Sequence, residues 1–317
     1  MKKISIIFIA LLLLCLLGSN SVAQAQWKET PLAQQEVTTA ITRLISVIEQ
    51  DYIHQSQGQQ AIDVLTQALN RGEFNGHFPY GRLKIKLESM LFAVTKDSNF
   101  ALHRLSGLSQ ASFTDDEIIP GAIQIKQLET NTGYLAVDGD FVDERWRAEL
   151  DIAMAELSDN EALIIDLRSA GMSSMAFAQH FLSYFWPSGE LLSEVSFAHN
   201  KRVEMVSENV VNRINEDTEV YVVTSPFVAG PWEFVAYTLQ QAGRATIVGQ
   251  ATIGLSFMTV INPFSEHLSI EMANAQIINP HSMDNWQDEG VIPDINSDAK
   301  DAVAETLLLI GHNQTDQ

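Results

Sequence analysis

The sequence predicts a mixed α/β (α+β) protein in which a small helical domain is followed by an α/β domain. Two observations lead to this fold class. Apolar residues recur at helical spacing up to residue 105, whereas after Gly121 short apolar runs alternate with helical stretches. Such alternation is typical of a largely buried sheet covered by helices. We place the helical domain at residues 26–108 and the α/β domain at residues 120–310.

The N-terminus has the order of a secretory signal peptide. Lys2 and Lys3 precede an apolar run from Ile4 to Leu17, and the small-residue triplet 23–25 follows. We therefore expect residues 1–25 to be removed after Ala25 and the mature protein to be periplasmic or secreted, without stable membrane insertion. A retained anchor is the alternative. The single Cys of the chain lies in this segment, so the mature chain would have no disulfide.

Three apolar stripes predict three helices in the N-terminal domain. The stripe residues are Val37, Ile41, Leu44, Ile45 and Ile48; then Ala61, Ile62, Val64, Leu65, Ala68 and Leu69; then Leu83, Leu87, Met90, Leu91 and Val94. A polar, turn-forming stretch from Ser106 to Gly121 predicts a loop between the domains.

The α/β domain is predicted from short apolar strands and the helical stretches between them. We expect strands at 133–137, 162–166, 220–224 and 245–248, and helices at 146–156, 175–185 and 232–241. Alternation without helical period across 257–278 indicates antiparallel strands. We also expect Asp298 to cap a last helix that reaches Leu309, with Gly311 just past its end.

The charge and the motifs exclude several classes of function. The chain carries 19 Lys and Arg against 40 Asp and Glu, a net charge of −21, which argues against binding to nucleic acid or to anionic membranes. The eight His residues include no pair at zinc-ligand spacing, and no phosphate loop or dinucleotide fingerprint is present. We therefore expect no metal and no cofactor.

Two strand-to-helix junctions are the candidate sites of chemistry. One is the stretch IIDLRSAGM at 164–172 and the other is TSPFVAGPW at 224–232. In each, we expect the strand to end in a glycine-containing turn, where the free backbone N–H groups of the next helix can stabilise an oxyanion or hold a carboxylate.

At these junctions the sequence resembles the tail-specific (C-terminal processing) serine proteases, especially their branch related to interphotoreceptor retinoid-binding protein. The segments that match the family in order are Gly133-Tyr134-Leu135, Ala162–Arg168, Glu233-Phe234, Gly243-Arg244-Ala245, Val248-Gly249, Thr252, Gly254 and Gly290–Ile295. The resemblance covers about residues 133–295 and implies a core of the ClpP and crotonase type behind the helical domain. It also implies a serine-type peptidase.

Carried over position by position, the resemblance implies a site without its catalytic groups. The family's nucleophilic serine lies three residues before the helix glutamate, and this position is Gly230. The lysine base of the tail-specific branch falls on Leu255, and the histidine of the related branch falls on Asn99. After Asp-Leu-Arg the family prefers Asn and consecutive glycines, whereas this chain has Ser169, Ala170, Gly171 and Met172, with a single glycine. Whether the chain is an enzyme therefore stays open.

Three other residues are candidates to replace the missing groups. Ser225 and Ser256 lie near the two replaced positions, and His103 lies four residues after Asn99. A nucleophile and its base must lie within hydrogen-bond reach of each other. The non-catalytic interpretation of Ser225 is a turn hydroxyl bonded to its own backbone, and that of His103 is a surface or core-edge histidine.

Three functions follow as hypotheses. In the first, the protein is an inactive family member that binds extended peptides or polypeptide C-termini, in a site lined by Met172, Gly230, Trp232 and Leu255. In the second, it is an active serine peptidase with a relocated nucleophile. In the third, it is a carrier of a hydrophobic small molecule, which rests only on analogy with the retinoid-binding relatives.

Overall fold

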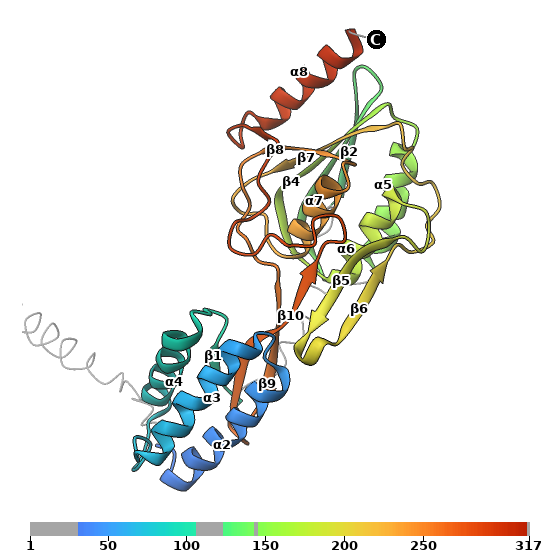
Figure 1. The fold of residues 1–317 in the computed structure, drawn as a ribbon. Helices are drawn as coiled ribbons and strands as arrows, with labels where there is room; N and C mark the ends of the chain where they lie inside the picture. The colour runs from blue at the N-terminus through green and yellow to red at the C-terminus, as the bar shows by residue number, and fades with distance from the viewer. Residues whose placement is uncertain (1–30, 106–122, 143–144, 316–317) are drawn as a thin grey trace, which may run out of the picture.

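The computed structural model describes residues 31–105, 123–142 and 145–315, and side chains as far as Gly311. It has a helical body at one end and an α/β core at the other, with one long strand running between them (Figure 1). The predicted signal peptide and the whole predicted loop at 106–121 lie outside the described residues. Within the described ranges, no helix has both the length and the apolarity to cross a membrane.

The helical body contains the three predicted helices. These are α2 (Gln34–Asp51), α3 (Gln55–Asn70) and α4 (Tyr80–Thr95), followed by the short strand β1 (Ala101–Arg104). The α2 stripe is buried as the spacing predicts, because residues three and four apart share one helix face. The helix α4 ends where Lys96 adopts a left-handed φ of 59°.

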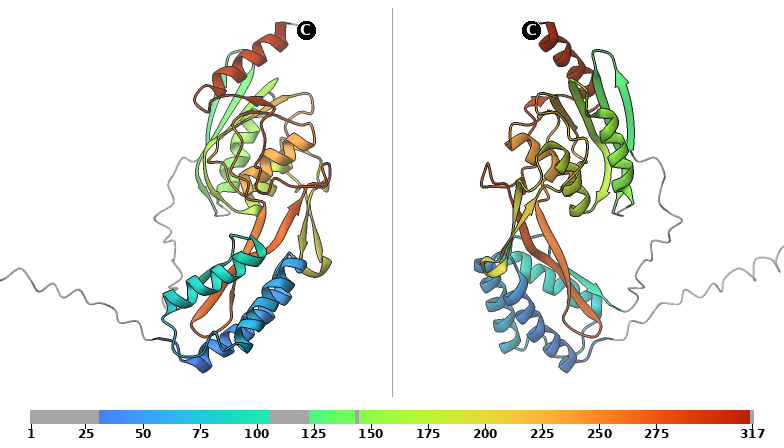
Figure 2. Two further views of the ribbon diagram at one scale, coloured as in Figure 1. Left: turned by 60° about the vertical axis from the view of Figure 1, so that its left-hand side comes forward. Right: turned by 90° about the vertical axis from the view of Figure 1, so that its right-hand side faces the viewer.

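The core under these helices is completed by residues from far along the chain. The strands β9 (Phe257–Pro263) and β10 (Leu268–Ile278) form the predicted antiparallel pair. Phe264 in their connecting turn and Leu268 and Ile270 on β10 are buried in the same cluster as the helix stripes. Figure 2 shows this hairpin lying against the helices in both views. The helical body is therefore built from two parts of the chain that lie far apart in sequence.

The strand β10 continues from the helical body into the α/β core. Its first residues pair with β1, and its pairing with β9 runs to Gln276 with an irregularity between Ala273 and Ala275. Its last residues pair with β5 (Leu191–Phe197) on the other side. The strand β5 in turn pairs with β6 (Arg202–Val206), which completes a five-stranded sheet. This β5–β6 hairpin was not predicted from the sequence.

A second sheet of six strands forms the α/β core. Its order is β11 (Ile295–Asn296), β8 (Thr246–Gly249), β7 (Glu219–Thr224), β4 (Ala162–Ser173), β3 (Thr132–Phe141) and β2 (Ile123–Leu128). All neighbours are parallel except β2 with β3. The interior strands carry almost continuous burial, as expected for parallel strands covered on both faces.

Helices cover both faces of this sheet. The helices α5 (Trp146–Leu157), α6 (Met175–Leu182) and α7 (Pro231–Gln241) pack on one face, and α6 is followed by a 3-10 turn at Ser183–Phe185. The other face is covered by α8 (Ala302–Thr315), at the end of the molecule far from the helical body (Figure 2). The expected end of this last helix was wrong, because α8 continues through Gly311.

Candidate functional site

The junction between β7 and α7 has the backbone form of an active-site elbow. The strand ends at Thr224, and Gly230 precedes the helix with φ 54° and ψ −116°. Glycine reaches this conformation readily, whereas residues with a Cβ are strained there. Pro231 begins the helix at a position where its fixed φ is favourable and its missing N–H costs nothing.

The carboxylate of Glu233 organises this elbow. Its side chain is fully buried. Its Oε2 accepts the N–H of Gly230 at 2.8 Å and the N–H of Leu255 at 2.9 Å. Its Oε1 accepts the N–H of Gly254 at 2.6 Å and the hydroxyl of Thr252 at 2.5 Å. Four donors therefore satisfy one buried carboxylate, and they fix the segment 252–255 beside the elbow.

The segment 252–255 is also held from its other side. Thr252 Oγ1 accepts the N–H of Val291 at 2.7 Å, and the N–H of Asp288 donates to the Gly254 carbonyl at 3.0 Å. Gly254 adopts a φ of 92°, and a Cβ there would meet the backbone of 288–290 at about 3 Å. The side chain of Leu255 is 47% exposed and starts from a backbone tied to the same oxygen as Gly230. The structure thus brings Gly230 and Leu255 together.

The other junction differs from the expectation, because it contains no turn. The strand β4 does not end before the glycine but continues to Ser173, with Ala170 still paired to Gly139 of β3. The N–H of Met172 donates to Asp140 Oδ1 at 2.7 Å. A Cβ on Gly171 would lie 2.4 Å from that same oxygen. The absent side chain at 171 therefore lets the two strands approach, and Asp140 stabilises the extension.

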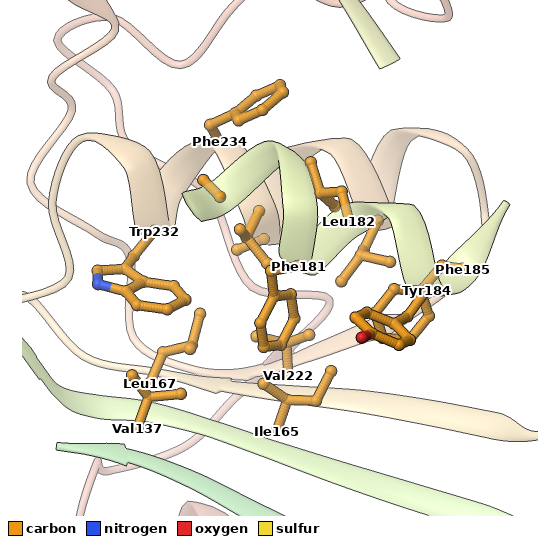
Figure 3. Close-up of a cluster of buried hydrophobic side chains, with 14 of the residues drawn as sticks. Val137, Ile165, Leu167, Phe181, Leu182, Tyr184, Phe185, Val222, Trp232 and Phe234 are labelled. Atoms are coloured by element: carbon orange, nitrogen blue, oxygen red, sulfur yellow. The ribbon is translucent and has the colours of Figure 1, made fainter. Parts of the chain in front are cut away.

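The two junctions lie side by side. The Ser225 hydroxyl donates to the carbonyl of Arg168 at 3.4 Å. In Figure 3 the Trp232 ring lies over Leu167, the residue before Arg168. Arg168 and Ser225 thus join the two junctions, and Gly171 and Met172 lie on the exposed stretch of β4 that follows Arg168.

The Trp232 ring lies beneath this region rather than on it. It is fully buried, and its centroid lies 5.6 Å from that of Phe141 and 5.8 Å from that of Phe181. Both contacts are edge-on, which is a favoured aromatic geometry. Trp232 therefore supports the elbow from the core.

At both junctions an amide that could stabilise an oxyanion donates instead to a carboxylate. The N–H of Gly230 is bound to Glu233, and the N–H of Met172 is bound to Asp140. An oxyanion hole needs donors aimed at the place where negative charge develops. Here each of these two amides already has a carboxylate acceptor.

Asn99 lies in the helical body and does not join Gly230. It follows α4, where both its backbone N–H and its Nδ2 donate to Asp97 Oδ1, at 2.8 and 2.7 Å. Asp97 Oδ2 accepts the Tyr52 hydroxyl at 2.9 Å. These contacts are those of a turn tied to the helical body.

The three candidate replacement residues are also engaged elsewhere. Ser225 is 3% exposed, and its hydroxyl donates to the Arg168 carbonyl. It also accepts the N–H of Phe227 at 3.3 Å, which is the contact that the non-catalytic interpretation predicts. Ser256 is 1% exposed, and its hydroxyl donates to Asn285 Oδ1 at 3.0 Å. The His103 ring lies on β1, 3.0 Å from the Glu271 carboxylate on β10. These contacts pair neither serine with a basic side chain.

Sequence reasoning missed the roles of Glu233 and Asp140. A glutamate three residues after the residue that precedes a helix is the capping-box pattern, so the contact of Glu233 with Gly230 was readable from spacing. Its contacts with the segment 252–255 were not. Asp140 reaches Met172 across 32 positions of sequence, and no local pattern signals that contact. Across the residues that the structure describes, no group of three or more His, Cys, Asp or Glu side chains could hold a metal.

The model of peptidase family S41 matches residues 121–297, which is more than half of the chain. The chain belongs to peptidase family S41. This match places both junctions, Gly230 and Leu255 inside the peptidase domain of the family.

Solved structures of similar fold extend the likeness to the helical body. The photosystem II D1 C-terminal processing protease superposes with a TM-score of 0.68 at 12% identity, covering 83% of this chain and 93% of that one. A candidate peptidase from Parabacteroides merdae gives 0.60 at 17% identity, covering 88% and 96%. A lipoprotein from Streptococcus agalactiae gives 0.60 at 10% identity, covering 89% and 98%. At these identities the structures establish the shared fold, and the activity of this chain is argued from its own residues.

Proposed function

We propose that this S41 chain is catalytically inactive and binds polypeptide in extended conformation beside Gly230. The observation that carries the proposal is the pairing of Gly230 with Leu255 on one carboxylate. Glycine has no group that can attack a carbonyl, and leucine cannot accept a proton. Loss of a catalytic nucleophile or its base lowers turnover on the order of a millionfold.

An open strand edge supports binding without cleavage. The strand β4 pairs with β7 only as far as Asp166, opposite Val223. From Ser169 to Ser173 the strand pairs with β3, and no described strand pairs on its other side. Ser169, Gly171 and Met172 are exposed there. An extended peptide can add to such an edge through main-chain hydrogen bonds, with side-chain pockets giving specificity.

The two alternatives gain less from the geometry. A relocated nucleophile would need Ser225 or Ser256 to leave the hydrogen bonds that bury it and to meet a base. A carrier needs an apolar cavity. One cavity of about 500 Å³, at the start of β7 and β8, is lined largely by polar residues, Glu216 and Asp217 among them. Another of about 430 Å³, beside Val47 and Phe264, is also lined by Arg43 and Glu266.

A cleavage assay combined with a binding assay tests the proposal. Protein covering residues 26–317 is incubated with unfolded polypeptides, and new N-termini are counted by mass spectrometry beside Ser225→Ala and Ser256→Ala preparations. We expect no cleavage above the contaminant level in any of them. Cleavage that disappears in one serine variant would overturn the proposal and identify the nucleophile.

The binding arm uses labelled ten-residue peptides and fluorescence anisotropy. Main-chain pairing predicts that N-methylation of alternate amides on one edge of the peptide abolishes binding, because the methyl group removes the donor. Methylation on the other edge serves as the matched control. Equal binding of both methylated peptides would exclude strand addition.

The proposed location outside the cytoplasm has its own test. We propose that residues 1–25 are a cleaved signal peptide, supported by the charged, apolar and small-residue order of that segment. N-terminal sequencing of the protein recovered from cells should begin at Gln26. A chain that begins at Met1 would contradict cleavage.

A further inference from the structure

The bound carboxylates at the two junctions determine which part of a polypeptide the site accepts. A free peptide C-terminus is normally held by backbone N–H groups gathered at a nest or a helix start. At this site the amides of Gly230 and Met172 already donate to Glu233 and Asp140. An incoming terminal carboxylate would lose its water, find these two donors occupied and meet charge of its own sign.

The exposed carboxylates around the open edge of β4 add to this repulsion. Asp138 and Asp140 are exposed on β3, the strand that pairs with the extension. Asp288 is exposed beside the segment 252–255, where its N–H donates to the Gly254 carbonyl. The guanidinium of Arg168 does not offset them, because it is bonded to Asp166 at 2.6 Å and to the Ala299 carbonyl. The surroundings of the edge therefore favour positive charge.

Exposed apolar side chains lie on the same region. Phe227, Ile253 and Leu255 are 83%, 52% and 47% exposed, and Met172 is 57% exposed. The backbones that carry Phe227, Ile253 and Leu255 are joined, since the N–H of Ile253 donates to the Val228 carbonyl at 3.2 Å, next to Phe227. Large apolar side chains exposed together on a soluble domain mark a binding surface.

We infer that the site takes an internal, extended segment in which apolar and Lys or Arg residues alternate, and that it rejects a free C-terminal carboxylate. This inference rests on the proposed function, because it assumes strand addition at Ser169–Ser173. Alternation sends the apolar side chains of a strand to one face and the basic ones to the other. The apolar face then lies toward Leu255, Ile253 and Phe227, and the basic face lies toward Asp138 and Asp140.

Four ten-residue peptides test this inference by fluorescence anisotropy with the protein of residues 26–317. The first alternates Val with Lys and is acetylated and amidated, and the second has the same sequence with a free carboxylate. The third replaces Lys with Glu, and the fourth replaces Lys with Ser. We expect the first to bind at least tenfold more tightly than the third and several-fold more tightly than the second and fourth. Raising salt from 50 to 500 mM should narrow these differences.

The variant Asp140→Asn keeps an oxygen that can accept the N–H of Met172 while it removes the charge. We expect it to bind the amidated basic peptide several-fold more weakly and to discriminate less against the free carboxylate. Asp63→Asn on α3 removes the same charge from an exposed position on the helical body and should change neither value.

The outcomes separate the two levels of the proposal. If none of the four peptides binds, the proposed function fails and this inference fails with it. If all four bind with equal affinity, strand binding stands and the selection described here is overturned. Tighter binding of the free carboxylate, or an equal effect of Asp63→Asn and Asp140→Asn, would also overturn it.

Discussion

The two strand-to-helix junctions of this S41 chain differ from the expected form of the site in opposite ways. At the β7–α7 junction the backbone of an elbow remains, with φ 54° at Gly230, but the reactive side chain is absent. At the β4–α6 junction the turn itself is absent, because the strand continues to Ser173. The first junction therefore has an elbow backbone without a reactive side chain at Gly230. The second has a strand where a turn was expected.

The difference shows that the elbow has a structural role independent of chemistry. Glu233 lies in the core and ties the helix start to the segment 252–255. Removing that carboxylate would leave several donors unsatisfied, so folding alone retains it. No comparable buried group holds a turn at Gly171, where the contact with Asp140 is exposed. At that junction the chain forms a strand edge and no turn.

The largest expected effect is at Glu233. Glu233→Ala should lower the free energy of unfolding by about 3–5 kcal/mol, because it leaves buried donors without an acceptor. Urea unfolding monitored by circular dichroism measures this. Glu149→Ala, in the exposed first turn of α5, is the matched control and should cost less than about 0.5 kcal/mol. Similar losses in both variants would mean that the elbow is not held as described.

Alanine at the two junction glycines should destabilise the protein for different reasons. At Gly171 the new Cβ would lie 2.4 Å from Asp140 Oδ1 and 2.8 Å from the Gly139 carbonyl oxygen, so the strands must separate, at about 1–3 kcal/mol. At Gly230 no atom lies within 4 Å, and the cost is about 1–2 kcal/mol from the positive φ alone.

Serine distinguishes these two causes in the same unfolding assay. Gly230→Ser should match Gly230→Ala, whereas Gly171→Ser should cost more than Gly171→Ala. Gly81→Ala, exposed on α4 with open space around it, should be neutral or slightly stabilising. Equal behaviour of serine and alanine at Gly171 would contradict the close approach of β3 and β4.

A hydrogen bond to Asp166, just before the β4 extension, makes the free energy of unfolding depend on pH. The Tyr134 hydroxyl donates to Asp166 Oδ2 at 2.7 Å. Burial, and then this hydrogen bond, raise the pKa of Tyr134 from 10.0 to about 12. The folded state thus keeps a proton that the unfolded state loses, so this contribution to stability is full below pH 10 and is lost as pH rises toward 12. Unfolding curves from pH 8 to 12 should show a smaller decline for Tyr134→Phe, and parallel declines would refute the assignment.

The smallest expected effect is on catalysis. Restoring both groups in Gly230→Ser with Leu255→Lys should give no cleavage above background, because Asp140 still holds the Met172 amide and the β4 extension still takes the place of the expected turn. Mass spectrometry of digested unfolded polypeptide measures this. The triple variant that adds Asp140→Ala frees the Met172 amide and is the informative comparison. Cleavage by the double variant would mean that only the side chains were lost.

The sequence by itself determined the elements that depend on local spacing. The helix stripes, the strand predicted at 220–224 and the helix predicted at 232–241 follow from the apolar period. The assignment of Gly230 and Leu255 to the family's serine and lysine positions likewise came from their distance to Glu233 and Gly254, which match the family in order. These features depend on residues a few positions apart, so a single chain is enough to predict them.

Tertiary structure alone decided what surrounds those positions. The extension of β4 depends on Asp140 reaching Met172, the burial of Trp232 depends on Phe141 and Phe181, and the helical body depends on β10. Each contact joins residues more than thirty positions apart. Local propensity carries no information about such partners, because only the packed sheet and helices bring them together.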